Sequence, residues 1–183
     1  QLAKKLFLEE HPTANIHVID SLSAGGEVDL IVKKLNDLIK EGLSFEQVVE
    51  AITRYQENTK LLFVLAKVDN LVKNGRLSKL IGAVIGLLNI RMVGEASDTG
   101  TLELLQKARG AKKALTAAVD EVLKAGYKGG RIIIAHRNNE KFCQQFTEVI
   151  KEKFPAADIS FLPTSGLCSF YAEEGGLLMG YEI

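Results

Sequence analysis

A short turn near the start of the chain carries the residue types best suited to hold an anion. Ser23, Gly25 and Gly26 lie between the apolar residues 16–19, a predicted strand, and a helical pattern. Glycines in such a turn leave backbone N–H groups free at the positive end of the helix, where a carboxylate or phosphate would fit. A nucleotide is not indicated, because the full glycine-rich fingerprint and a P-loop lysine are missing. A plain connection with Ser23 as helix cap has the same pattern.

The second candidate is an apolar slot in residues 78–88, which we predict to form a buried helix. Its glycines alternate with large apolar residues, so the missing side chains would leave an elongated space for a ligand chain. Close packing against another helix or the sheet accounts for the same pattern without a ligand. The residues predicted to line the slot are Leu80, Ile81, Val84, Ile85 and Leu88.

Three cations, Arg109, Lys112 and Lys113, lie close together at the expected start of another helix. This end of a helix is the less favourable one for positive charge, so the cluster indicates an external anion or an acidic partner. A solvated helix face would carry the same residues. We find no nucleophile elbow, metal-ligand spacing or acid–base constellation, and therefore predict no catalytic residues and no metal.

The C-terminal residues 165–176 gather hydroxyls and glycines in a stretch predicted to be non-helical, just before a final strand. Polar groups there would close one end of an apolar cavity, with Ser169 and Tyr171 as the candidates. The alternative is an ordinary loop with Tyr171 packed on the core.

Apolar periodicity predicts an α/β chain that positions these residues. A helix ending near residue 41 and a capping box at residues 44–47 follow the first turn, in the order typical of a doubly wound parallel sheet. After residue 60 the pattern changes to a mixed sheet with helices. We predict strands at 61–66, 89–96, 101–106, 131–136, 158–162 and 177–181, and helices at 67–73, 78–88, 107–125 and 139–154.

Composition excludes several classes of function. The 183 residues are 46% hydrophobic and carry 23 basic and 23 acidic residues, so no net positive field favours nucleic acid. The longest apolar runs are far shorter than the roughly 20 residues that cross a bilayer. Cys143 and Cys168 do not suggest a disulfide framework, which predicts a reducing, cytoplasmic compartment. The start, without an initiator Met or signal pattern, leads us to expect an N-terminally truncated protein.

Taken in order, these segments resemble the DegV family of bacterial fatty-acid-binding proteins. The matching pieces are residues 18–21, 74–78, 87–91, 107–114 and the glycine-rich C-terminal segment. The resemblance implies a two-lobed fold. Residues 1–59 would form a partial, parallel Rossmann-like lobe that lacks its first strands, and residues 60–183 a mixed-sheet lobe, partly antiparallel, that holds a lipid.

The resemblance also implies a function. The protein would hold a long-chain fatty acid, with its tail in the slot and its carboxylate between the lobes. The residues that would bind this head group are Ser23, Gly25 and Gly26, with Ser169 and Tyr171 opposite them. A separate fatty acid kinase would phosphorylate the carboxylate for phospholipid synthesis, so this chain would be a carrier rather than an enzyme, with no cofactor. The cation cluster would contact the partner, and a transient contact with a membrane stays open.

The chain departs from the family pattern at three positions. Gly25 lies where many members have a serine, and Tyr171 or Ala172 lies where many have a histidine. Glu27 adds a negative charge near the expected carboxylate. Two other functions therefore stay open: a phosphate-binding lobe of a kinase-like enzyme, and an interaction module without a ligand.

Overall fold

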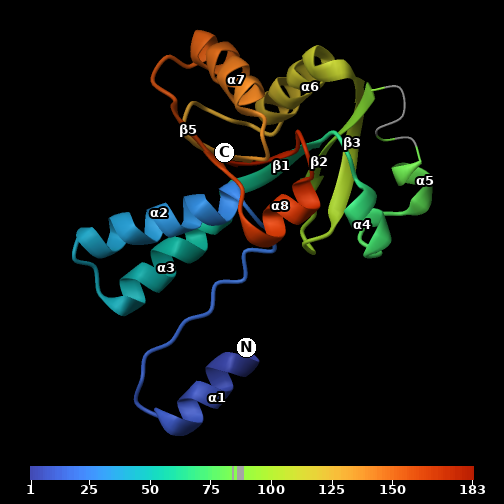
Figure 1. The fold of residues 1–183 in the computed structure, drawn as a ribbon. Coiled ribbons are helices and arrows are strands. Elements are labelled where there is room, and N and C mark those ends of the chain that lie inside the picture. The colour runs from blue at the N-terminus through green and yellow to red at the C-terminus, as the bar shows by residue number, and fades with distance from the viewer. Residues whose placement is uncertain (84, 86–88) are drawn as a thin grey trace.

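The computed structural model describes residues 1–83, 85 and 89–183 and contains a six-stranded mixed sheet (Figure 1). The strand order is β3-β2-β1-β6-β4-β5; β4 and β5 are parallel and the other neighbours antiparallel. The strands are β1 (Thr59–Leu65), β2 (Ile90–Ala96), β3 (Leu102–Arg109), β4 (Arg131–His136), β5 (Asp158–Pro163) and β6 (Leu177–Glu182). The α/β class and the mixed sheet predicted from the sequence are confirmed.

Eight helices are described, and all but α1 lie against the sheet or against helices that cover it. They are α1 (Leu2–Glu10), α2 (Gly26–Lys40), α3 (Phe45–Gln56), α4 (Asp69–Lys73), α5 (Lys79–Gly82), α6 (Gly110–Lys124), α7 (Glu140–Lys153) and α8 (Gly166–Ala172). None of them combines the length and apolar character needed to cross a membrane.

The two faces of the sheet bury different sets of side chains, because alternate residues of a strand point to opposite faces. Leu62 and Val64 of β1 join a core cluster with Ala118 of α6 and Phe146 of α7. Phe63, the residue between them, joins a second cluster on the other face. This second cluster also contains Leu65, Val68, Leu71, Leu77, Ile85 and Met92.

Helix α2 covers the second face over β4 and β6, and two glycines allow it to lie unusually close. A Cβ at Gly26 would overlap the carbonyl oxygen of Ile133, and a Cβ at Gly180 would overlap the backbone of Glu27. An ion pair from Arg131 to Asp37, 3.3 Å long, fixes the helix near its other end. The start of α2 and the turn before it are therefore held at a defined place on the sheet.

Helix α3 packs on α2, and the predicted capping box is confirmed at its start. The Ser44 hydroxyl accepts from the Gln47 backbone, and the Gln47 side chain accepts from the Ser44 backbone. Tyr55 near the helix end donates a 2.7 Å hydrogen bond to Glu182 of β6. These contacts attach the α2–α3 pair to the central strands.

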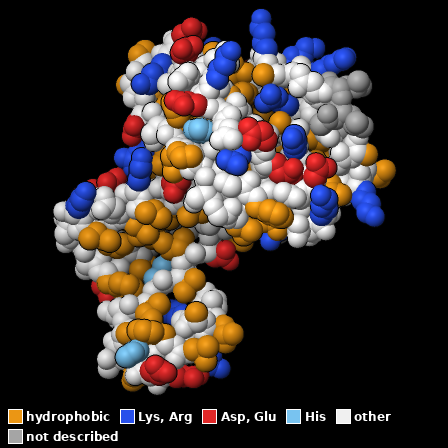
Figure 2. All heavy atoms as spheres, in the orientation of Figure 1, with side chains coloured by type: hydrophobic (Ala, Val, Ile, Leu, Met, Phe, Trp, Pro, Cys, Tyr) orange, Lys and Arg blue, Asp and Glu red, His pale blue; other side chains and the backbone are white. Residues whose placement is uncertain are grey.

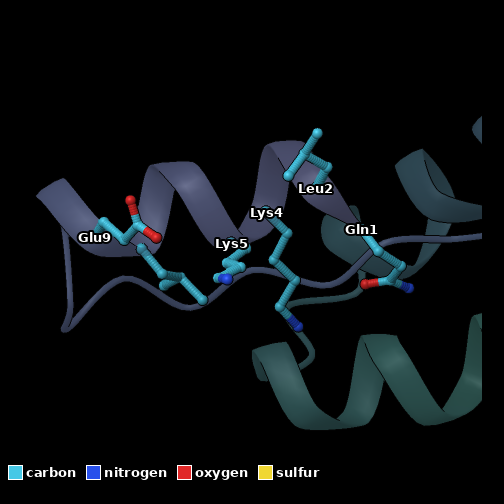
Figure 3. A pocket seen from close by; sticks show the side chains of 6 residues that line it. Gln1, Leu2, Lys4, Lys5 and Glu9 are labelled. Carbon is cyan, nitrogen blue, oxygen red and sulfur yellow. The ribbon is translucent and has the colours of Figure 1, made fainter.

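Helix α1 lies apart from the sheet, at the end of an extended segment (Figure 1), and buries none of its residues. A hollow of about 630 Å³ lies beside it, lined by Gln1, Leu2, Lys4, Lys5, Leu8 and Glu9. Figure 3 shows these side chains on and next to the helix. All six belong to α1 or precede it, so this hollow is separate from the sheet and its helices.

Three predicted elements differ from the structure. Residues 16–19 form no strand, because no described strand pairs with them. The helix predicted at 78–88 is observed at Lys79–Gly82, and Val84 and Leu88 lie outside the described residues. Residues 165–176, predicted to be non-helical, contain α8. Residues 1–59 contribute helices α1 to α3 to this arrangement, and the division into lobes at residue 59 stays a prediction.

Candidate functional site: a cleft over the second face of the sheet

A cleft of about 560 Å³ lies over the second face of the sheet, beside the start of α2. Leu61 of β1 and Leu178 of β6 contribute apolar side chains from the sheet, and residues 20–24 form one wall. The other walls come from α4, the β2–β3 hairpin and α8. They contribute Leu71, Gly75, Arg76, Ala96, Thr99, Gly100, Thr101, Leu102 and Tyr171. Much of the lining is therefore apolar, and its charged residues are Asp20 and Arg76.

Ser23 lines this cleft, and its side-chain oxygen is buried without a hydrogen-bond partner among the described residues. The turn is held by local hydrogen bonds, from the Leu22 backbone to Asp20 and from the Ser23 backbone to the Ser21 hydroxyl. A buried hydroxyl without a partner costs about 1–3 kcal/mol, so this position is primed for a ligand that can accept or donate a hydrogen bond.

Tyr171 also lines the cleft, and the guanidinium of Arg76 lies over its ring at 4.7 Å from the centroid. Helix α8, which carries Tyr171, is tied to α4 by two hydrogen bonds of 2.8 Å. In these bonds the Asn70 backbone donates to Glu173, and the Asn70 amide donates to the Phe170 carbonyl. The structure thus brings Ser23 and Tyr171 to one cleft.

Arg76 was not among the candidate site residues from the sequence, although it belongs to the segment 74–78 that resembles the family. Gly75 has a φ of +68° and ends α4, and the Arg76 backbone N–H donates to the Leu71 carbonyl over 2.8 Å. This helix end directs Arg76 to the cleft, where it is the cation of the lining. Gly75 in the sequence indicates that a helix ends here, but the direction in which the Arg76 side chain then points depends on how α4 packs.

The glycines of the first turn have a packing role. Gly25, at a φ of +58°, lies against Leu178 and Ala135, and Gly26 is buried against the β4 backbone. Gly25 lines a neighbouring hollow of about 350 Å³ together with Thr164, Ser165 and Cys168. The close fit of α2 on the sheet therefore explains why Gly25 and Gly26 are glycines, without a role in binding a phosphate.

Ser169 is placed differently from Tyr171. Its hydroxyl shares a 2.8 Å hydrogen bond with the Thr164 hydroxyl, and it is not among the residues that line the cleft. Glu27 is buried, and its carboxylate accepts a 2.8 Å hydrogen bond from the Thr59 hydroxyl. The Glu27 carboxylate is therefore hydrogen-bonded to β1, and Glu27 is not among the residues that line the cleft.

The predicted acyl slot is only partly assembled by the described residues. Leu80 is 85% exposed on α5, which does not fit a place in a buried slot. Ile85 is buried in the second cluster, and Ile81 packs against it. Leu71 belongs to this cluster, and Leu102 and Tyr171 pack against it. All three also line the cleft, so the cleft and the cluster adjoin.

The predicted cation cluster lies on the far side of the sheet from the cleft. Arg109 ends β3, and Lys112 and Lys113 follow in the first turn of α6; all three are exposed. Figure 2 shows Lys and Arg side chains gathered over this end of the molecule, around α6 and α7. No acidic side chain is paired with the three cations in the described part of the chain.

A fold with a mixed sheet, an apolar cleft and a buried serine hydroxyl at its edge agrees with the family resemblance drawn from the sequence. The model of the DegV family, described as a family of uncharacterised proteins, matches residues 1–181. The chain belongs to the DegV family.

Curated relatives from streptococci are similar over the whole chain. DegV domain-containing proteins of Streptococcus pneumoniae and Streptococcus pyogenes serotype M1 are 79% and 68% identical over 183 residues. The alignments cover all of this chain and 65% of each relative, so the chain spans about two thirds of their length.

Two solved structures of relatives contain fatty acids. The Streptococcus pneumoniae fatty acid kinase B3 protein, loaded with linoleic acid, is 79% identical with a TM-score of 0.98, over 100% of this chain and 65% of that one. A DegV family protein from Eubacterium eligens, loaded with heptadecanoic acid, is 39% identical with a TM-score of 0.95. This alignment covers 99% of this chain and 66% of that one.

Proposed function

We propose that this protein binds a long-chain fatty acid, with the carboxylate at the edge of the cleft and the hydrocarbon tail over the sheet. The observation that carries the proposal is the buried Ser23 hydroxyl, which lacks a partner and lines an apolar cleft. A carboxylate oxygen at this position would accept its hydrogen bond.

The head group has further partners in the same lining. The Arg76 guanidinium offers a charge-assisted hydrogen bond, and the Tyr171 hydroxyl offers a neutral one. Arg76 also offsets the negative charge of Asp20 at this edge. The binding site thus combines few polar groups with much apolar surface, as ligand sites for amphipathic molecules do.

The tail would run along Leu61 and Leu178 toward Leu71 and Leu102. Each buried CH₂ group contributes about 0.8 kcal/mol, so the apolar floor supplies most of the affinity. The cleft volume of about 560 Å³ falls within the range of small-molecule sites. Ile81 and Ile85 lie in the adjoining cluster and would meet the end of a longer chain.

The fatty acid structures of the relatives support this proposal, as does the name of the S. pneumoniae protein, which is part of a fatty acid kinase. We propose the same division of labour here: this chain presents the carboxylate, and a separate kinase phosphorylates it for phospholipid synthesis. Arg109, Lys112 and Lys113 would contact that partner, because all three are exposed and carry no acidic partner of their own among the described residues. The two unpaired thiols, Cys143 and Cys168, suit the reducing cytoplasm.

The test is extraction of the purified protein with organic solvent, followed by mass spectrometry for fatty acids. We expect fatty acid from the unmodified protein, and about tenfold weaker binding of a fluorescent fatty acid to Ser23→Ala. Ser169→Ala is the matched control, since the Ser169 hydroxyl is bonded to Thr164. Repeated absence of fatty acid, or full affinity of Ser23→Ala, would overturn the proposal.

A further inference from the structure

A second cavity, of about 600 Å³, lies on the opposite face of the sheet from the cleft, between α6 and α7. It is lined by Arg91, Ala111, Lys112, Leu115, Asn139, Lys141, Phe142, Gln145, Glu148 and Val149. The proposed acyl cleft shares none of these residues, although Lys112 also belongs to the three cations proposed to contact the kinase.

Arg91 of β2 comes from the sheet side of this cavity. Its neighbour Met92 belongs to the second cluster and Val93 to the first, so Arg91 and Val93 point to the same face, toward α6 and α7. The Nε and Nη1 atoms of Arg91 are buried and have no hydrogen-bond partner in the part of the chain that the structure describes. Burial also lowers the pKa of the guanidinium, which reflects the cost of keeping this charge away from water.

The surroundings of Arg91 add positive charge. Lys112 of α6 and Lys141 of α7 line the cavity and are exposed, so they lie where a ligand would enter from solvent. Glu148 is the acidic residue of the lining. Three cations against one carboxylate leave a net charge of about +2 around a cavity with the partly buried guanidinium of Arg91 at its base.

The first turns of two long helices meet at the same cavity. Ala111 and Lys112 belong to the first turn of α6, and Lys141 and Phe142 to the first turn of α7. Neither helix has a side-chain cap; α6 has no acidic residue in its first turn, whereas the first turn of α7 carries Glu140. The free N–H groups and partial positive charge of the α6 start therefore add to the field of Arg91 and the two lysines, while Glu140 offsets part of this field at the start of α7.

The geometry points to a second binding site, which takes a phosphate group held by Arg91, Lys112 and Lys141. A phosphate carries several acceptor oxygens and up to two negative charges, so it can satisfy the guanidinium and both lysines at once. The group would come from inorganic phosphate or from a small phosphate monoester.

The test is binding of inorganic phosphate to the full chain, measured by calorimetry and by the thermal unfolding midpoint at constant ionic strength. We expect 20 mM phosphate to raise the midpoint by about 2–4 °C relative to chloride, because a ligand of the folded state stabilises it. Arg91→Met should bind phosphate at least about tenfold more weakly and lose this shift. Phenyl phosphate and acetate, as further arms, distinguish a monoester and a simple carboxylate from the free ion.

Two variants keep the result interpretable. Lys151→Met removes an exposed charge from the far end of α7 and should bind phosphate like the unmodified chain. Lys141→Met retains the buried guanidinium and should weaken phosphate binding about threefold to tenfold. Equal phosphate affinity in Arg91→Met and the unmodified protein, or no specific stabilisation by phosphate over chloride, would overturn the inference. Fatty acid content should be the same in all these variants, because the cavity lies on the other face of the sheet.

Discussion

The guanidinium of Arg76 lies over the aromatic ring of Tyr171, 4.7 Å from its centroid, at the edge of the cleft that Ser23 also lines. The contact joins the end of α4 to α8. It holds a cation next to the position proposed for a ligand carboxylate.

Replacing Arg76 by methionine should weaken fatty acid binding about tenfold, because a charge-assisted hydrogen bond is lost at an exposed edge of the site. The affinity of the unmodified protein should fall with increasing salt, and that of the variant should change less. Fluorescent fatty acid titrations at two ionic strengths measure both effects. Lys73→Met removes a nearby exposed charge outside the lining, and it should behave like the unmodified chain.

A charge on the cleft floor should abolish acyl binding. Leu178→Asp places a carboxylate under the proposed tail, which we expect to reduce fatty acid affinity by about 100-fold. Leu80→Asp tests the residue that the sequence predicted for the slot, and the structure predicts no effect because Leu80 is 85% exposed. Loss of fatty acid binding in Leu80→Asp would instead support the slot predicted from the sequence.

The close approach of α2 to the sheet predicts a large effect of Gly26→Ala. The added methyl group would overlap the Ile133 carbonyl, so α2 must shift, at a cost of about 2–3 kcal/mol in the free energy of unfolding. Urea unfolding measures this loss. Asn36→Ala is exposed in the same helix and should be neutral or slightly stabilising; equal stability of both variants would contradict the predicted overlap.

Alkaline pH should destabilise the fold through Tyr127. Burial, followed by nearby negative charges, raises the pKa of this tyrosine to about 12, and its hydroxyl donates to the Gly130 carbonyl over 2.7 Å. In the unfolded chain the phenol loses its proton near pH 10, so between about pH 10 and 12 the unfolded state binds fewer protons and stability falls.

Urea unfolding at pH 8 and pH 11 checks this sign. Tyr127→Phe should be less stable at pH 8, by about 1 kcal/mol for the lost hydrogen bond, but should lose less stability than the unmodified protein on going to pH 11. If the unmodified protein and Tyr127→Phe lost the same free energy of unfolding between pH 8 and pH 11, groups other than Tyr127 would cause the alkaline effect.

The sequence alone determined the α/β class and most strands of the sheet. Residues 131–136 were predicted as a strand and form β4, and the capping box at Ser44 begins α3 as predicted. These features depend on local periodicity and local hydrogen bonds, which a sequence displays directly. The DegV family was recognisable for the same reason, because its motifs are local.

Only the tertiary structure decided which residues share a site. Ser23, Arg76 and Tyr171 are far apart in sequence and meet because α2, α4 and α8 lie on one face of the sheet, whereas Ser169, two residues before Tyr171, bonds to Thr164. The sequence placed Arg91 only in a segment that resembles the family, whereas the tertiary structure buries its Nε and Nη1 atoms without a partner among the described residues. Periodicity indicates that a face is buried, but the neighbour across that face depends on how distant elements pack.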